Sequence, residues 1–478
     1  MASVYPKIIQ GGMGVAVSSW PLARAVSLRG QLGVVSGTGL DTIVARRLQL
    51  GDIGGHIRRA IDHFPIAEMA ERVWERYFIP GGKSPGAPFK SKPMPAAKMS
   101  KALSELIVVG TFVEVFLAKE GHSGLVGINL LEKIQIPTLP TLFGAMMAGV
   151  DYVLMGAGIP RSIPAALDDM SVLKPTSLRL DVAGALPGEI FESPFDPTQF
   201  AAEPVKRPKF LAIVSSNALA TTLARKSTGE VNGFVVEGST AGGHNAPPRG
   251  ALQLSEKGEP IYGQRDTPDL AGFRELGLPF WLAGSYGSAE RLQEALSEGA
   301  AGIQVGTPFA FCEESGIDRE IKAEVIRHVM EGDGQVFTDP CASPTGFPFK
   351  VVQLEGTLSD RETYEGRTRI CDLGYLRQSY RKENGTIGYR CAGEPVEDYV
   401  KKGGDAADTV GRKCLCNGLI ATVGMPQLRK GGEIEPAIVT AGDCLPQIAE
   451  YVTAERTTYS AGEVIDRLLG VEGSSTEK

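Results

Sequence analysis

The sequence predicts a (β/α)8 barrel, and three observations favour this fold class. Eight short apolar runs, each ending in glycine or a small polar residue, occur between residues 7 and 309. Helical periodicity recurs between them, as in residues 288–300, where Leu292 and Leu296 share one face. The runs do not alternate with polar residues, which is typical of parallel strands buried on both faces. Eight such strand–helix units are the number in this barrel.

The expected strands lie, in chain order, at residues 7–14, 32–39, 125–131, 152–158, 210–216, 233–239, 280–287 and 302–309. An open doubly wound sheet is the alternative. Its dinucleotide-binding motif needs three spaced glycines, and the segments "GAGIPR" and "GTGLDT" both lack the third. The barrel is therefore the better prediction.

Two long connections interrupt the repeat, residues 41–105 after the second strand and residues 186–208 after the fourth unit. Loops that follow barrel strands lie at the carboxyl ends of the strands, so we expect both insertions over that face. Phe191, Phe195 and Phe200 in the second insertion could form a lid over a hydrophobic substrate. Packing of this loop on itself is the alternative.

The last third of the chain differs from the rest, because it is polar and holds six of the seven cysteines. We expect a barrel of residues 1–345, a cysteine-containing insertion or subdomain of residues 346–450, and a barrel-closing helix and tail of residues 451–478. The candidate metal ligands are Cys371, Cys391, Cys414 and Cys416. They lack the paired Cys-X2-Cys spacing of common zinc sites, so reduced cysteines without a metal are predicted. Zinc or an iron–sulfur cluster is the alternative.

Charge and hydropathy exclude several classes of protein. A net charge of −7 argues against nucleic-acid binding, which needs a clustered basic face. The most apolar stretch, residues 141–160, contains Asp151 and several glycines, so no membrane span is predicted. The first residues lack the pattern of a signal peptide. We therefore expect a cytoplasmic protein that binds a small molecule, and the sequence leaves homo-oligomerisation open.

Glycines gather at the carboxyl ends of the expected strands. Gly284, Ser285 and Gly287 end the seventh run, and Gly306 and Thr307 end the eighth. Backbone N–H groups in such turns, close to helix starts, bind anions, and these two loops are the common phosphate position in the barrel. The pattern predicts a phosphate site, with simple turn glycines as the alternative.

Five motifs in a fixed order carry a resemblance to a known family. They are "IIQGGMG", "VGIN", "MGAGIP", "EGSTAGGH" and "GIQVGTPF". Over roughly residues 5–345, the chain resembles the FMN-dependent barrel family of nitronate monooxygenases (2-nitropropane dioxygenases) and the related flavin enoyl-ACP reductases. The resemblance implies FMN with its phosphate at Gly284–Gly287 and Gly306–Thr307. It also implies cofactor contacts from Gly11, Gly12, Met13, Asn129, Glu237, Gly242 and Gly243.

The same resemblance implies that His244 faces the flavin and the substrate. Imidazole is suited to proton transfer near neutral pH, so His244 could take the α-proton of a neutral nitroalkane. The resulting nitronate would be oxidised with O2, which makes a nitronate monooxygenase the first prediction. In a flavin enoyl reductase, NAD(P)H would be the co-substrate and His244 would orient the thioester or protonate the product. A flavin-binding protein without catalysis is the third hypothesis. For His244 itself, the alternative to a catalytic role is a structural role in capping a turn.

Two positions depart from the nitronate monooxygenase pattern. Many members have glutamine where this chain has Glu237, and many begin "QAPM" where this chain has "QGGM". The second feature is nearer to the enoyl reductases. Fold and cofactor therefore follow more directly from the resemblance than the reaction does.

Overall fold

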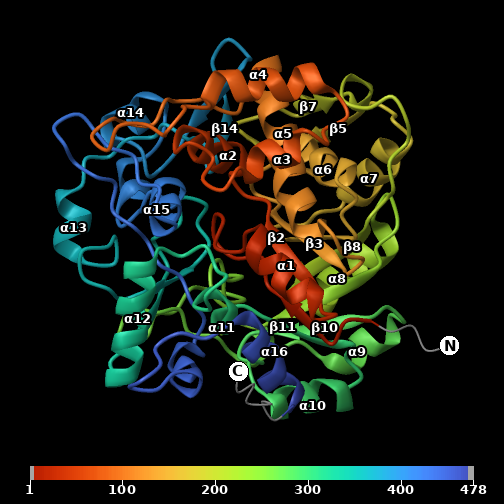
Figure 1. The fold of residues 1–478 in the computed structure, drawn as a ribbon, viewed down its shortest axis with the longest axis vertical. Helices are drawn as coiled ribbons and strands as arrows, with labels where there is room; N and C mark the ends of the chain where they lie inside the picture. The colour runs from red at the N-terminus through yellow and green to blue at the C-terminus, as the bar shows by residue number, and fades with distance from the viewer. Residues whose placement is uncertain (1–4, 472–478) are drawn as a thin grey trace.

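The predicted barrel is confirmed by the computed structural model, which describes residues 5–471 (Figure 1). Eight parallel strands form one sheet in the order β1, β11, β10, β9, β8, β4, β3, β2. Their bounds are β1 (Ile8–Gln10), β2 (Gly33–Ser36), β3 (Val126–Leu131), β4 (Tyr152–Gly156), β8 (Lys209–Val214), β9 (Gly233–Glu237), β10 (Phe280–Ala283) and β11 (Gly302–Val305). Each strand begins within one residue of its predicted start.

The sheet closes between its first and last strands just before β2. Leu32 N donates to Ile8 O at 3.1 Å, and Gln10 N donates to Leu32 O at 3.0 Å. This parallel bridge joins β1 to the residue just before β2 and so closes the sheet into a barrel. The carboxyl ends of the strands, which the glycine-rich loops follow, are therefore brought to one face.

Side chains of the strands alternate between the barrel interior and the surrounding helices, as a pleated strand requires. One cluster fills the interior, and its members include Ile9, Val34, Leu154, Leu211, Val235 and Trp281. Trp281 is completely buried, and its indole Nε1 donates to Pro6 O at 2.8 Å. The intervening strand residues, such as Ile8 and Phe280, pack instead with the helices. The apolar runs are continuous because both faces are buried.

Helices follow the strands around the barrel. They are α1 (Trp20–Leu28), α5 (Lys101–Lys119), α6 (Thr138–Met147), α7 (Ile163–Ser171), α8 (Asn217–Lys226), α9 (Leu270–Glu275), α10 (Ala289–Ser297) and α16 (Ala461–Leu469). Serine side chains cap the first turns of α5, α8, α10 and α16, satisfying N–H groups that have no partner within the helix. The last helix, α16, packs against α1 and α10 (Figure 1).

The first insertion forms three helices and a loop. The helices are α2 (Leu40–Gln49), α3 (His56–Ile61) and α4 (Ala67–Tyr77), and all three pack against or beside α5 on the outside of the barrel. The loop 78–99 crosses to the C-terminal segment, where Phe89 N donates to the Gln427 side chain at 2.8 Å and Ala97 N donates to Tyr389 OH at 2.7 Å. The three helices of this insertion thus lie outside the barrel, and its loop contacts the C-terminal segment.

The second insertion, residues 186–208, completes a hairpin that starts before it and lies beside α6. Strands β5 (Thr176–Arg179) and β7 (Glu192–Phe195) pair antiparallel, and η1 (Pro197–Gln199) follows. Phe195 and Phe200 are buried and stack with ring centroids 5.3 Å apart, and Phe195 also lies 5.6 Å from Phe143 of α6. These rings belong to the outer helix layer, so the lid predicted from them is wrong. The two rings bury their apolar surface against Phe143 of α6 instead of over a substrate.

The C-terminal segment is irregular and joined to the barrel through a shared core. Its elements are β13 (Phe349–Val352), α13 (Arg361–Gly366), β14 (Gln378–Arg381), β15 (Ile387–Arg390), α14 (Val396–Lys401), η3 (Ala406–Thr409), α15 (Leu415–Thr422) and η4 (Leu445–Tyr451). Between the last barrel strand and this segment lie α11 (Thr307–Ala310), α12 (Arg319–Glu331) and β12 (Val336–Asp339). Two further short elements, β6 (Val182–Ala183) and η2 (Gln264–Asp266), lie earlier in the chain. Strand β6, at the tip of the hairpin, pairs with β14. One hydrophobic cluster contains Val15 and Ile43 from the barrel side together with Leu415, Ile420 and Ile438.

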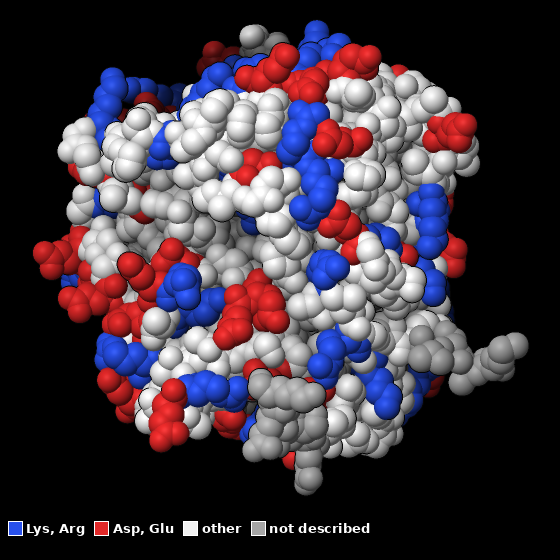
Figure 2. Space-filling model, viewed as in Figure 1, with Lys and Arg blue, Asp and Glu red and all other residues white. Residues whose placement is uncertain are grey.

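Two observations concern membrane spans and surface charge. Within residues 5–471, no helix combines the length and the apolar character needed to cross a bilayer. On the face shown in Figure 2, basic and acidic side chains are interspersed.

Trp281→Ala is expected to destabilise the barrel by about 3–5 kcal/mol, because it empties the volume of a fully buried ring and removes the indole bond to Pro6. Equilibrium urea unfolding followed by circular dichroism measures the change. Ile53→Ala is the matched control, since that side chain is 82% exposed and should change stability by less than about 0.5 kcal/mol. Equal effects of the two substitutions would contradict the assignment of Trp281 to the interior.

Candidate functional site

A cavity of about 1300 Å³, including the part open to solvent, lies at the carboxyl ends of the strands. All thirteen site residues proposed from the sequence line it: Gly11, Gly12, Met13, Asn129, Glu237, Gly242, Gly243, His244, Gly284, Ser285, Gly287, Gly306 and Thr307. They come from β3 and β9 themselves, from the loops after β1, β9, β10 and β11, and from the start of α11. None of Phe191, Phe195 and Phe200 is among the lining residues.

The loop after β1 is held by two buried polar residues that the sequence analysis missed, Gln10 and Ser18. Gln10 Nε2 donates to Ser18 Oγ at 2.8 Å, and Val34 N donates to Gln10 Oε1 at 2.9 Å. Ser18 Oγ in turn donates to Gly11 O at 2.8 Å and accepts from Met13 N at 2.9 Å. The loop is thus held by the protein's own hydrogen bonds. The signal in the sequence was a glutamine at the end of an otherwise apolar run.

Gly12 and Asn129 face each other across one wall of the cavity. A β-carbon on Gly12 would lie 2.3 Å from Asn129 Cβ, so only glycine fits there. Asn129 Nδ2 donates to Gly12 O at 3.2 Å, whereas its buried Oδ1 has no hydrogen-bond partner among the described residues. Gln304, from β11, also lines the cavity, and its buried Oε1 likewise has no hydrogen-bond partner among the described residues. Buried acceptors of this kind call for a ligand that donates hydrogen bonds.

Another part of the cavity is built from turns and helix starts. Gly284 has φ of +94°, and a β-carbon there would lie 2.9 Å from Thr240 Oγ1. The loop continues directly into α10, and Gly306 precedes the first turn of α11. In the part of the chain that the structure describes, no lysine or arginine lines the cavity. An anion bound here would therefore be held by backbone N–H groups and hydroxyls.

Glu237 and His244 are the two ionisable side chains whose proton affinity this cavity changes most. Burial raises the pKa of Glu237 to about 7 and lowers the pKa of His244 to about 4. Both shifts have the same physical cause, because an apolar environment disfavours the charged form of each group. His244 is therefore neutral at pH 7, and a neutral imidazole can accept a proton.

The His244 ring is fixed by its neighbours. Its Nε2 is 2.7 Å from Ser343 Oγ, and Ser343 Oγ is 2.7 Å from Thr345 Oγ1. The edge of the ring meets Phe349 with centroids 4.8 Å apart and planes at 71°. These contacts leave Nδ1 as the ring nitrogen without a protein hydrogen bond among the described residues.

The C-terminal segment supplies a wall that sequence reasoning missed. Its lining residues are Phe349, Leu419, Thr440, Ala441, Gly442 and Cys444. The backbone around His244 pairs with this segment: Lys350 N donates to Gly243 O and Asn245 N donates to Pro348 O, each at 2.9 Å. Gly243 N also donates to Thr440 Oγ1 at 2.9 Å. The segment has no periodic pattern that could have indicated this wall.

No family model matches the sequence. A probable nitronate monooxygenase from Staphylococcus haemolyticus (strain JCSC1435) is 29% identical over 199 residues, which are 41% of this chain and 52% of the relative. The resemblance to the nitronate monooxygenases is thereby confirmed over a match that spans about half of the relative's length.

Two solved structures align with nearly all of the chain. FabK from Thermotoga maritima has 14% sequence identity and a TM-score of 0.49, with 98% of this chain and 93% of that chain covered. A nitroalkane oxidase from Streptomyces ansochromogenes has 14% identity and a TM-score of 0.46, with 98% and 96% covered. At these values the two structures do not bear on the activity of this chain.

Glu237→Gln should remove one component of the pH dependence of stability. The folded state raises the pKa of Glu237 from 4.5 to about 7, so the folded protein binds the proton more tightly than the unfolded chain. Glu237 therefore lowers stability progressively as pH rises from 4.5 to about 7. The melting temperature of the variant minus that of the wild type should increase over this window and then level off. A difference that is constant from pH 4 to pH 8 would contradict the burial of this carboxyl group.

Proposed function

We propose that the chain is an FMN-dependent oxidoreductase and that it acts as a nitronate monooxygenase. The observation that carries the proposal is the convergence of thirteen residues, scattered from Gly11 to Thr307, on one cavity at the carboxyl ends of the strands. The similarity to a probable nitronate monooxygenase supports the reaction. Small-molecule nitronates and O2 are the proposed substrates.

The residues present fit FMN. Its phosphate would be held at Gly284–Gly287 and Gly306–Thr307, where backbone N–H groups and two helix starts meet. Thr307 Oγ1 accepts a hydrogen bond from Gly442 N at 2.9 Å and contacts the Cys444 side chain, and its hydroxyl could turn to donate to a phosphate oxygen. The ring system would lie along Gly12 and Met13, where Asn129 Oδ1 offers an acceptor. FMN supplies the capacity to take electrons from a nitronate and to pass them to O2.

His244 is the proposed general base for neutral nitroalkanes. It is uncharged at neutral pH, so it can remove the α-proton without first losing one of its own. Ser343 holds the imidazole in one orientation through the contact at Nε2. Glu237, with a pKa of about 7, could donate a hydrogen bond in its protonated form and accept one in its ionised form. Its position at the end of β9 directs this group to the same cavity as His244.

The cofactor and the reaction can be tested together. Purified protein is expected to be yellow and to release FMN on heating, and protein that stays colourless after reconstitution with FMN would refute the proposal. In anaerobic stopped-flow mixing, propyl-nitronate should bleach the flavin without NAD(P)H. Rapid bleaching by NAD(P)H alone would point instead to the flavin enoyl-ACP reductase alternative. Bleaching by neither reagent would indicate flavin binding without this catalysis.

His244→Asn should separate proton removal from substrate positioning. The variant is expected to keep FMN, because the proposed cofactor contacts are made mainly by backbone groups. Its kcat/KM for neutral nitroalkanes should fall by roughly 10²–10⁴, the usual loss for a general base. Its kcat/KM for preformed nitronates should fall much less, since that proton is already gone. Equal losses on both substrates would assign His244 to positioning.

A further inference from the structure

Four cysteines of the C-terminal segment line one small cavity, separate from the large one. They are Cys371, Cys391, Cys414 and Cys416, and the cavity has a volume of about 300 Å³. They come from three separate parts of the chain: after α13, after β15, and at the start of α15. All four are free thiols in the structure. A fold that brings four thiols from distant segments to one buried space is typical of a metal site.

Hydrogen-bond donors surround these sulfur atoms. The backbone N–H groups of Tyr375 and Leu376 face Cys416 Sγ, and that of Gly393 faces Cys391 Sγ. Asn417 Nδ2 lies 3.6 Å from Cys414 Sγ. A neutral thiol has little need of so many donors, whereas a metal-bound thiolate is stabilised by N–H···S contacts.

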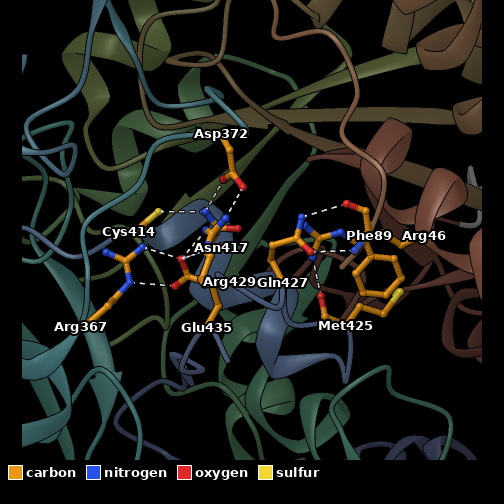
Figure 3. A network of polar contacts seen from close by, with 10 residues as sticks. All are labelled: Arg46, Phe89, Arg367, Asp372, Cys414, Asn417, Met425, Gln427, Arg429 and Glu435. Atoms are coloured by element: carbon orange, nitrogen blue, oxygen red, sulfur yellow. Dashed lines mark hydrogen bonds and ion pairs between the residues drawn. The ribbon is translucent and has the colours of Figure 1, made fainter. Parts of the chain in front are cut away.

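A buried network of charged groups fixes the segments that carry the cysteines (Figure 3). Asp372, next to Cys371, accepts hydrogen bonds from Asn417 Nδ2 at 2.8 Å and from Arg429 Nη1 at 2.6 Å. This ties the loop of Cys371 to the helix that carries Cys416. Figure 3 also shows Arg367 on the Cys414 side of the network, bound to Glu435 at 2.8 Å.

The spacing of the sulfur atoms selects the kind of metal group. Zinc bound to four thiolates at about 2.3 Å would hold them about 3.8 Å apart. Within the described residues, no three of these cysteine sulfurs lie within 4.8 Å of one another. The four sulfurs are thus not gathered around one point as a single zinc ion requires, and a larger group with thiolate ligands could span them. We propose that Cys371, Cys391, Cys414 and Cys416 bind an iron–sulfur cluster.

The proposed cluster would adjoin the large cavity. Helix α15 carries Cys416 at its start and Leu419 one turn later, and Leu419 lines the large cavity. Three residues of α-helix advance about 4.5 Å along the axis. The two cavities therefore share α15 as a common wall. The cluster assignment depends only on the cysteine cavity and is independent of the flavin reaction proposed above.

The test is metal analysis of the full-length protein, purified anaerobically and reconstituted with iron and sulfide. We expect iron and acid-labile sulfide in equal amounts, about two or about four of each per chain. Reduction with dithionite should give an electron paramagnetic resonance signal distinct from that of a flavin radical. One zinc per chain without sulfide, no retained metal, or a Cys371–Cys391 disulfide in the anaerobic protein would each overturn the proposal.

Cysteine variants then test the ligands. Cys391→Ser and Cys416→Ser should each lose most of the bound iron and sulfide. Cys341→Ser is the matched control, because Cys341 is exposed and does not line the cysteine cavity, and it should retain the wild-type amounts. Circular dichroism shows whether each variant is folded, and the wild-type analysis decides the proposal even where a variant is not. Full iron and sulfide in both cavity variants would also overturn it.

Discussion

The large cavity depends on a short stretch of main-chain pairing between two parts of the sequence. Residues 243–245, from the loop after β9, lie antiparallel to the chain at Phe349, with hydrogen bonds of 2.9 Å on either side of His244. The pairing fixes the backbone that carries the histidine, and it also brings Phe349 against the ring. Without it the backbone at His244 would lose its main-chain partners, and the wall formed by the C-terminal segment would be held only by the shared core and the side-chain contacts.

The barrel and one side of its cavity could be predicted from the sequence because both follow from local patterns. Parallel strands covered on both faces are continuous apolar runs, so all eight were found close to their observed starts. Their glycines identified the carboxyl-end loops, because close approach and left-handed backbone favour glycine, as at Gly12 and Gly284.

What could not be predicted depends on contacts between distant segments. Main-chain hydrogen bonds between distant segments do not require particular side chains. The sequence therefore did not indicate that Thr440 and Gly442 line the cavity. The phenylalanines of residues 186–208 show the converse limit. Their hydrophobicity indicated burial correctly, but a sequence does not say which apolar surface will receive a ring, and α6 received these. Gln10 belongs to the same class, because its partners Ser18 and Val34 are visible only in three dimensions.

The helix layer of the barrel has a consequence for how the protein is made. Helix α1 ends at Leu28, and its neighbour α16 begins at Ala461, so the contact between them joins the two ends of the described chain. A ribosome adding about 5–20 residues per second needs on the order of tens of seconds to cover that interval. During this time the apolar side of α1 lacks one of its permanent partners. The apolar side of α1 is thus prone to aggregation until α16 has been made, and shielding by a chaperone would matter most for the unit formed by β1 and α1.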